Sequence, residues 1–287
     1  MPIDSAAAPA RALAAAPRRG RRRIAVAGAA VVLAAVVAGM IRLLWSDTPA
    51  QLPEPRCQAV IEDGSTASID IEQSENASLI AGVAAQRGLI PRAVSIALAT
   101  AFQESKIRNL DYGDLDSLGL FQQRPSAGWG TPEEILDPYY STNMFYDAME
   151  RVDGWQSADI GDVAQEVQRS AFPDAYDQHI ARARILASAL SGETPAAWSC
   201  VVHSAATADP VGLAEAAKQA YGSEITAFES TPADPDGKAA KLQFDGTTEQ
   251  AAWSAAAFAQ SWAAAKGVQS VQVGDRLWTA AADGYAP

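Results

Sequence analysis

The segment from Ile24 to Ile41 constrains the fold most, because its 18 residues contain no charged or strongly polar side chain. At a rise of about 1.5 Å per residue, a helix of this length spans roughly the 30 Å hydrocarbon layer of a bilayer. Six arginines precede the segment and only Arg42 follows it closely, which predicts a cytoplasmic N-terminus. We expect a basic cytoplasmic tail over residues 1–23 and one transmembrane anchor over residues 24–45. A cleaved signal peptide is one alternative, although its apolar core is usually only about 7 to 15 residues long, and a buried helix of a soluble protein is the other.

The chain beyond the anchor is strongly acidic. The whole sequence carries a net charge of −12, and after residue 42 it has 15 basic against 33 acidic side chains. Nucleic-acid phosphates would be repelled by such a body, so we exclude nucleic acid as a partner. Three prolines between residues 46 and 56 favour an extended stalk, and residues 46–73 are interpreted as an extracytoplasmic linker.

The sequence contains two cysteines, Cys57 and Cys200. If the anchor places both outside the cytoplasm, they are expected to form a disulfide, and two free buried thiols are the alternative. The two cysteines and the two histidines never occur at the close spacings that structural zinc requires. We therefore expect no metal and no cofactor.

Helical patterns dominate residues 74–200. Ser74 is a candidate N-cap for a helix that stops at Gly88, and Pro91 begins a second helix. An irregular loop is expected over residues 106–131 because it is rich in glycine, proline, asparagine and aspartate. Further helices are expected at about 132–151, 159–170 and 176–190. Residues 74–200 are accordingly predicted to form a mainly α-helical domain.

Residues 201–287 have a different pattern, in which helices alternate with short β-branched stretches. This alternation predicts a small α/β domain at the C-terminus. The expected helices are 213–221 and 249–266, and the expected strands are 224–227, 241–244, 268–273 and 276–279. The fold class predicted for the whole chain is α+β.

The second helix ends in a carboxylate that is a candidate general acid. The helix is apolar in almost every direction and therefore should run through the core, yet Glu104 lies at its C-terminal end. The helix dipole disfavours negative charge there, and apolar surroundings disfavour ionisation, so both effects favour the protonated acid. A protonated carboxyl near neutral pH is what acid catalysis needs.

The stretch after this helix contains a motif. Glu104 and Ser105 are followed, after a loop, by Ser117-Leu118-Gly119-Leu120-Phe121-Gln122-Gln123-Arg124-Pro125. This arrangement resembles the signature of the lysozyme-like superfamily, especially lytic transglycosylases and goose-type lysozymes, over roughly residues 75–190. The resemblance implies a peptidoglycan glycosidase with a lysozyme-like fold, in which Glu104 is the catalytic acid and base. It also implies that Ser105, Ser117, Gly119 and Gln122 lie at the substrate.

Two further groups of side chains are candidates for the site. A hydrolase needs a second carboxylate to activate water, for which Asp111, Asp114 and Asp116 are the candidates. A lytic transglycosylase instead uses the N-acetyl group of its substrate, and the sequence leaves hydrolysis and transglycosylation open. Aromatic rings that could stack on sugars are those of Trp129 and Tyr176, with Tyr139 and Tyr140, and core packing is the alternative for each.

The chain departs from the family pattern in a later segment. Transglycosylases carry a Tyr-Asn-Ala-Gly type motif there, whereas this chain has Gln168-Arg169-Ser170-Ala171-Phe172-Pro173-Asp174-Ala175-Tyr176. Arg169, Ser170 or Tyr176 is expected to fill the corresponding position. The main expectation is a membrane-anchored enzyme that cuts peptidoglycan glycan strands outside the cytoplasm. The alternative is a catalytically weak peptidoglycan-binding or scaffold protein of the cell envelope, and no protein partner can be named from the sequence.

Overall fold

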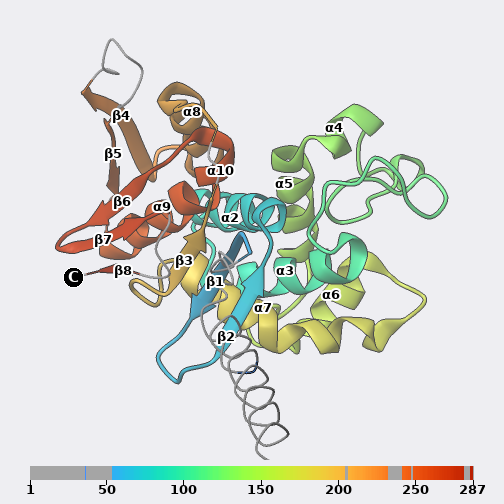
Figure 1. Cartoon of the computed structure of the whole chain (residues 1–287). Coiled ribbons are helices and arrows are strands. Elements are labelled where there is room, and N and C mark those ends of the chain that lie inside the picture. Colours follow the sequence, from blue (N-terminus) through green and yellow to red (C-terminus); the bar gives the residue numbers. More distant parts are fainter. Residues whose placement is uncertain are drawn as a thin grey trace, which may run out of the picture. The chain divides into compact units, whose positions relative to one another are not determined.

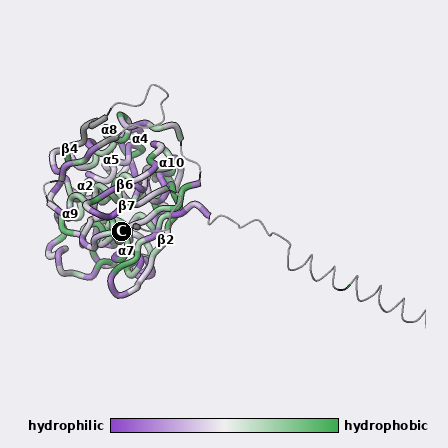
Figure 2. The backbone as a smooth tube through the Cα atoms, turned by 60° about the vertical axis from the view of Figure 1, so that its left-hand side comes forward, coloured by the Kyte–Doolittle hydropathy of each residue, from purple (hydrophilic) through white to green (hydrophobic). Residues whose placement is uncertain are grey.

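The computed structural model describes residues 54–203, 206–231, 241–246, 248–280 and 285–286, and the single position Val36 (Figure 1). The predicted cytoplasmic tail and transmembrane anchor, residues 1–45, lie outside the described residues apart from Val36. None of the helices within the described ranges combines the length and apolar composition that a membrane crossing requires. Hydrophilic and hydrophobic stretches are mixed along the coloured part of the backbone in Figure 2.

The fold is of the α+β class, as predicted, and its first part is built around helix α3, Pro91–Ser105. Eleven of the fifteen residues of α3 are buried, and the helix packs against α2, α5, α6 and α7. The elements around it are α2 (Ile71–Gln86), η1 (Pro125–Ala127), α4 (Pro132–Leu136), α5 (Pro138–Met149), α6 (Ile160–Gln168), η2 (Pro173–Tyr176) and α7 (Asp177–Leu190). Helix α3 therefore runs through the core and ends just after Glu104, as predicted.

The start of α2 and the extent of the helix expected over residues 132–151 differ from the predictions. Helix α2 begins at Ile71 because Asp70 forms a capping box with Gln73. Ser74, the predicted cap, lies inside the helix and is buried. The single helix expected over residues 132–151 is two helices, because Asp137 leaves the helical conformation and caps α5, in which Pro138 is the first residue.

A small antiparallel sheet, which the sequence analysis missed, includes part of the predicted linker. Strand β1 (Arg56–Val60) lies between β2 (Thr66–Ile69) and β3 (Trp198–Val201). Residues 56–69 therefore do not form the unstructured linker expected within residues 46–73. The alternation of polar and apolar residues along β1 and β2 is weak because some inward positions carry small residues, as at Ala59 and Ala67.

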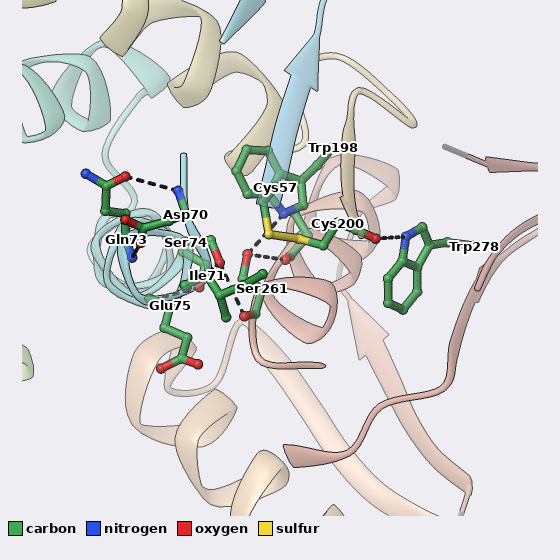
Figure 3. Close-up of a disulfide and its surroundings, with 12 residues drawn as sticks. Cys57, Asp70, Ile71, Gln73, Ser74, Glu75, Trp198, Cys200, Ser261 and Trp278 are labelled. Atoms are coloured by element: carbon green, nitrogen blue, oxygen red, sulfur yellow. Dashed lines mark hydrogen bonds between the residues drawn. A yellow bond between two sulfur atoms is a disulfide. The ribbon is translucent and has the colours of Figure 1, made fainter. Parts of the chain in front are cut away.

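The predicted disulfide is confirmed: Cys57 and Cys200 face each other across β1 and β3 and are bonded. The surroundings tie this sheet to the C-terminal part of the chain (Figure 3). The indole Nε1 of Trp198 donates to Ser261 Oγ at 3.0 Å, and that of Trp278 donates to the Cys200 carbonyl oxygen at 3.0 Å. Residues on both sides of position 200 thus share one buried region.

The C-terminal part contains helices and strands, as expected, and its strands pair antiparallel. Its elements are α8 (Pro210–Tyr221), β4 (Ile225–Thr231), β5 (Lys241–Gly246), α9 (Glu249–Ser261), α10 (Ala263–Lys266), β6 (Ser270–Val273), β7 (Arg276–Thr279) and β8 (Tyr285–Ala286). The pair β4–β5 and the sheet β6–β7–β8 are separate. The helix expected over residues 249–266 is interrupted at Trp262.

Helices α8 and α9 pack directly against α2. The main hydrophobic core combines residues of α2, α3 and α7 with Ala257, Ala263 and Trp278 from the C-terminal part. Residues Pro53–Pro287 accordingly form one compact unit. Residues 74–200 and 201–287 share this core, and their division into two domains stays a prediction.

Candidate active site around Glu104

Glu104 is the penultimate residue of α3, at the point where the helix leaves the core. Its neighbours Phe102 and Ser105 are buried, whereas the Glu104 side chain is half-buried. Lys106 ends the helix in the left-handed conformation, with a φ of 56°. The carboxyl is thus carried on a rigid buried helix while part of it remains accessible.

Tyr176 holds one oxygen of this carboxyl. The tyrosine hydroxyl donates a hydrogen bond of 2.7 Å to Glu104 Oε1, and its ring is fully buried. Burial, followed by the hydrogen bond to Glu104 and the negative charge there, raises the pKa of Tyr176 far above its usual value of 10. The phenol therefore remains a donor at physiological pH. Among the described residues, none donates to the second oxygen, Oε2.

Ser105 connects the end of α3 to the loop that carries the motif. Its Oγ lies 2.7 Å from the Leu120 carbonyl oxygen and 3.1 Å from that of Ala101. Gln168 Nε2 donates to the neighbouring Phe121 carbonyl at 2.7 Å, and the side chains of Leu120 and Phe121 are fully buried. The motif loop is therefore anchored beside Glu104 by Ser105 from one side and by α6 from the other. Ser105, predicted at the substrate, is buried in this anchor.

Gly119 is placed where only glycine fits. Its φ is 76°, and an added Cβ would lie 2.8 Å from the Ile135 carbonyl oxygen. Its N–H donates to the Leu110 carbonyl at 2.7 Å, which pairs the two arms of the loop. Gly119 thus lies close to α4 within the protein, whereas the sequence predicted that it would lie close to sugar.

Ser117 and Gln122 lie in this same loop, but no hydrogen bond among the described residues joins either to Glu104. Ser117 is buried. Gln122 has a φ of 48°, and its Nε2 lies 3.3 Å from the carbonyl oxygens of Tyr112 and Gly119. The Gln122 amide therefore braces the loop from inside.

The three aspartates of the loop differ in their surroundings. Asp116 accepts 2.8 Å hydrogen bonds from Arg124 Nε and from the Ser126 N–H, and the Arg124 bond is the main reason that its pKa lies far below the usual value. Both of its oxygens are engaged, and it is held as an anion. Asp111 and Asp114 are exposed. Asp116 is therefore a structural member of the loop.

A group of polar side chains adjoins Glu104 on the outer surface of α3. Gln103 Oε1 lies 3.2 Å from both Gln178 Nε2 and His179 Nε2. The His179 ring also stacks on Phe102, and burial followed by the charge of Arg182 lowers its pKa. A neutral imidazole is therefore favoured in this row of hydrogen-bonding groups.

Most of the aromatic side chains predicted to stack on sugars are packed or hydrogen-bonded within the protein. Tyr176 is buried, Trp129 packs partly into the core, and Tyr139 donates to the Ala216 carbonyl at 3.3 Å. Two aromatic residues that the sequence analysis did not select, Tyr112 and Phe172, are largely exposed. Their positions in the sequence could have indicated this exposure, because each residue precedes a turn residue, Gly113 or Pro173, within a segment already compared with the family.

Of the candidates for the altered later motif, Tyr176 is the side chain that reaches Glu104. Arg169 ends α6 in the left-handed conformation and is exposed. No group of three or more metal-ligating side chains is found in the part of the chain that the structure describes. No protein-family model matches the sequence, and the search of curated proteins gives no match.

Proposed function

We propose that this protein cleaves peptidoglycan glycan strands, as a lytic transglycosylase or a muramidase, with Glu104 as general acid and base. The observation that carries the proposal is the Glu104 carboxyl itself. It lies near the C-terminal end of the buried helix α3, and one of its oxygens accepts a hydrogen bond from the Tyr176 hydroxyl. The motif loop is attached to the next residue, Ser105, through the Leu120 carbonyl. One residue of the motif, Leu120, is thus hydrogen-bonded to the residue that follows the acid.

The arrangement suits proton transfer to a glycosidic oxygen. The protonated carboxyl would present Oε2 to the leaving oxygen while Oε1 stays on Tyr176. After the transfer, the Tyr176 hydrogen bond stabilises the new carboxylate, since a hydrogen bond to an ionised acceptor is stronger than one to a neutral acceptor. The same carboxylate can then remove a proton from the incoming nucleophile.

The aspartates favour transglycosylation over hydrolysis. Asp116, with both oxygens engaged by Arg124 and Ser126, is unsuited to orient a water molecule. Asp111 and Asp114 lie on an exposed turn. In a transglycosylase, the N-acetyl group of the substrate would stabilise the oxocarbenium-like centre, and the 6-hydroxyl of the sugar would be the nucleophile.

The proposed location is the outer face of the cytoplasmic membrane, with residues 24–45 as the anchor. The buried Cys57–Cys200 disulfide supports it, since such bonds persist in oxidising compartments. The proposal thus brings the acid to the side of the membrane where peptidoglycan lies.

Product analysis tests the proposal. The full-length protein, kept in a sugar-free non-ionic detergent, is incubated with purified peptidoglycan, and soluble fragments are identified by mass spectrometry. We expect fragments ending in 1,6-anhydro-muramyl residues. Fragments with reducing ends would show a muramidase, and the absence of soluble fragments would favour the scaffold alternative and overturn the proposal.

A further inference from the structure

The residue before the candidate acid, Gln103, has no role in the mechanism proposed above. Its side chain is half-buried, and its Oε1 lies 3.2 Å from both Gln178 Nε2 and His179 Nε2. Because an amide oxygen can only accept hydrogen bonds, both of these nitrogens act as donors. Gln103 therefore holds two consecutive residues of α7.

These two residues lie in the first turn of α7, directly after Tyr176. Tyr176 is the last residue of η2 and the N-cap of α7, but no side-chain hydrogen bond caps this helix. Gln178 Nε2 also donates to the Ala175 carbonyl oxygen at 3.0 Å. The hydrogen bonds around Gln103 thus reach residues on both sides of Tyr176.

The first turn of α7 has little apolar packing of its own. The buried residues of α7 begin at Ala183, in its second turn. Before it, Ile180 packs only partly against the core, and the His179 ring stacks on Phe102 of α3 with the ring centroids 5.6 Å apart. The contacts of Phe102 and Gln103 therefore contribute much of what fixes this turn to α3.

Three successive residues of α3 contact this junction between η2 and α7. Phe102 and Gln103 contact the first turn of α7, and Glu104 accepts the hydrogen bond from Tyr176. That bond is 2.7 Å long, and a hydrogen bond weakens steeply as its donor and acceptor move apart or out of line. A small displacement of the start of α7 would therefore weaken the bond to Glu104.

We propose that Gln103 is a positioning residue for the candidate acid, because it holds the start of α7 where the Tyr176 hydroxyl meets Glu104 Oε1. The inference rests on the proposed function of Glu104. A reacting group keeps its productive geometry only if the side chains that orient it are themselves fixed by packing and hydrogen bonds. Gln103 thus acts through Tyr176 and not on the substrate.

A double-mutant cycle with the full-length protein tests the inference. Gln103→Met keeps the length of the side chain and removes both hydrogen bonds. We expect it to lower kcat for fragment release about three- to tenfold, because the Tyr176 hydroxyl is displaced. In a Tyr176→Phe background the same substitution should change kcat by less than about twofold, since no hydroxyl remains to be positioned. Gln250→Met, which changes an exposed glutamine of α9, is the control and should leave kcat unchanged.

His179→Phe provides a second variant. It keeps an aromatic ring against Phe102 and removes one of the two hydrogen bonds to Gln103. We expect a smaller fall in kcat than for Gln103→Met, and this fall should also disappear in the Tyr176→Phe background.

The outcomes separate this inference from the proposed function. If Gln103→Met leaves kcat unchanged, or lowers it equally in both backgrounds, Gln103 does not act through Tyr176, and the inference is wrong while the proposed function stands. If the wild type releases no fragments, the proposed function fails, and the cycle is measured by urea unfolding instead. A midpoint shift that is smaller in the Tyr176→Phe background would then support the positioning of the hydroxyl, and equal shifts would overturn it.

Discussion

The Glu104 carboxyl combines two environments. One oxygen accepts a hydrogen bond from a tyrosine that burial keeps protonated, and the side chain as a whole is only half-buried. The tyrosine fixes the orientation of the carboxyl. In the proposed mechanism, this division of roles between two oxygens would let a single side chain give and then take a proton at one place.

Removing the Tyr176 hydroxyl should therefore slow the reaction. We expect Tyr176→Phe to lower kcat on peptidoglycan by about tenfold or more, because a hydrogen bond to a charged group contributes about 1.5–3 kcal/mol. Release of soluble fragments is the measurement. Tyr221→Phe is the matched control, since it removes another buried tyrosine hydroxyl, bonded to Ser254, and should leave kcat unchanged. Equal effects of the two substitutions would contradict the positioning role.

Glu75 predicts a pH dependence of stability. Burial, followed by the charge of Glu72, raises its pKa from 4.5 to about 7, although Lys266 opposes the shift. Because the folded-state pKa is the higher one, the folded protein binds this proton more tightly. The resulting stabilisation is complete below about pH 4.5 and is lost as the pH rises through 7.

Glu75→Gln should therefore be more stable than the wild type at pH 8, by about 1–2 kcal/mol after allowance for partial solvent exposure. The two proteins should become equally stable near pH 4. Urea unfolding at both pH values measures this difference. A variant less stable than the wild type at pH 8 would show that the ionised carboxylate is favourable in the folded state.

At the scale of elements, the motif loop depends on the close contact of Gly119 with α4. We expect Gly119→Ala to lower the free energy of unfolding by about 2–3 kcal/mol, because a positive φ and a contact with a backbone carbonyl are both unfavourable for alanine. Peptidoglycan cleavage should fall with it. The urea midpoint and the rate of fragment release are the measurements.

Gly128→Ala provides the control for backbone strain alone. Gly128 has a φ of 85°, and nothing lies within 4 Å of its added Cβ. The loss of stability there should be about 1 kcal/mol. If both substitutions lower the free energy of unfolding equally, the contact between Gly119 and the Ile135 carbonyl does not contribute to the effect of Gly119→Ala.

The sequence predicted some elements well and others not at all, for physical reasons. Helix α3 was predicted because its apolar residues are continuous and Pro91 marks its start. Strands β1 and β2 were missed because Ala59 and Ala67 give little contrast between inward and outward positions. The division between α4 and α5 was also missed, although the Asp137-Pro138 pair that causes it is visible in the sequence.

For the candidate site, the sequence predicted Glu104 as the acid and Tyr176 as one candidate for the later motif, but not the hydrogen bond between them. Tyr176 reaches Glu104 across a separation of 72 residues, which no local pattern reveals. Ser105 and Gln122 were expected at the substrate, yet Ser105 Oγ and Gln122 Nε2 are hydrogen-bonded within the protein. Tyr112 and Phe172 are largely exposed, and the sequence alone did not single them out.

At the scale of the whole molecule, the disulfide is the main covalent constraint. It joins residues 143 positions apart, and its sheet is hydrogen-bonded to α9 and β7 through Trp198 and Trp278. We expect the double variant Cys57→Ser with Cys200→Ser to lose up to about 4 kcal/mol of unfolding free energy, because the unfolded chain gains conformational freedom. Urea unfolding followed by tryptophan fluorescence measures the loss.

Reduction provides the control for the disulfide variant. Adding dithiothreitol to the wild type should lower its urea midpoint to that of the variant, and the variant itself should not respond. An unchanged midpoint in the reduced wild type would show that the disulfide does not constrain the chain as described.

The most direct test of the whole account is the rate at which Glu104→Gln releases soluble fragments from peptidoglycan. Glutamine can still accept the hydrogen bond from Tyr176 but cannot donate a proton as an acid. We predict a fall of about 10²- to 10⁴-fold relative to the wild type. Glu166→Gln, which changes an exposed glutamate on α6, should leave the rate unchanged. A Glu104→Gln rate within about threefold of the wild type, well short of the contribution expected of a general acid, would contradict the account.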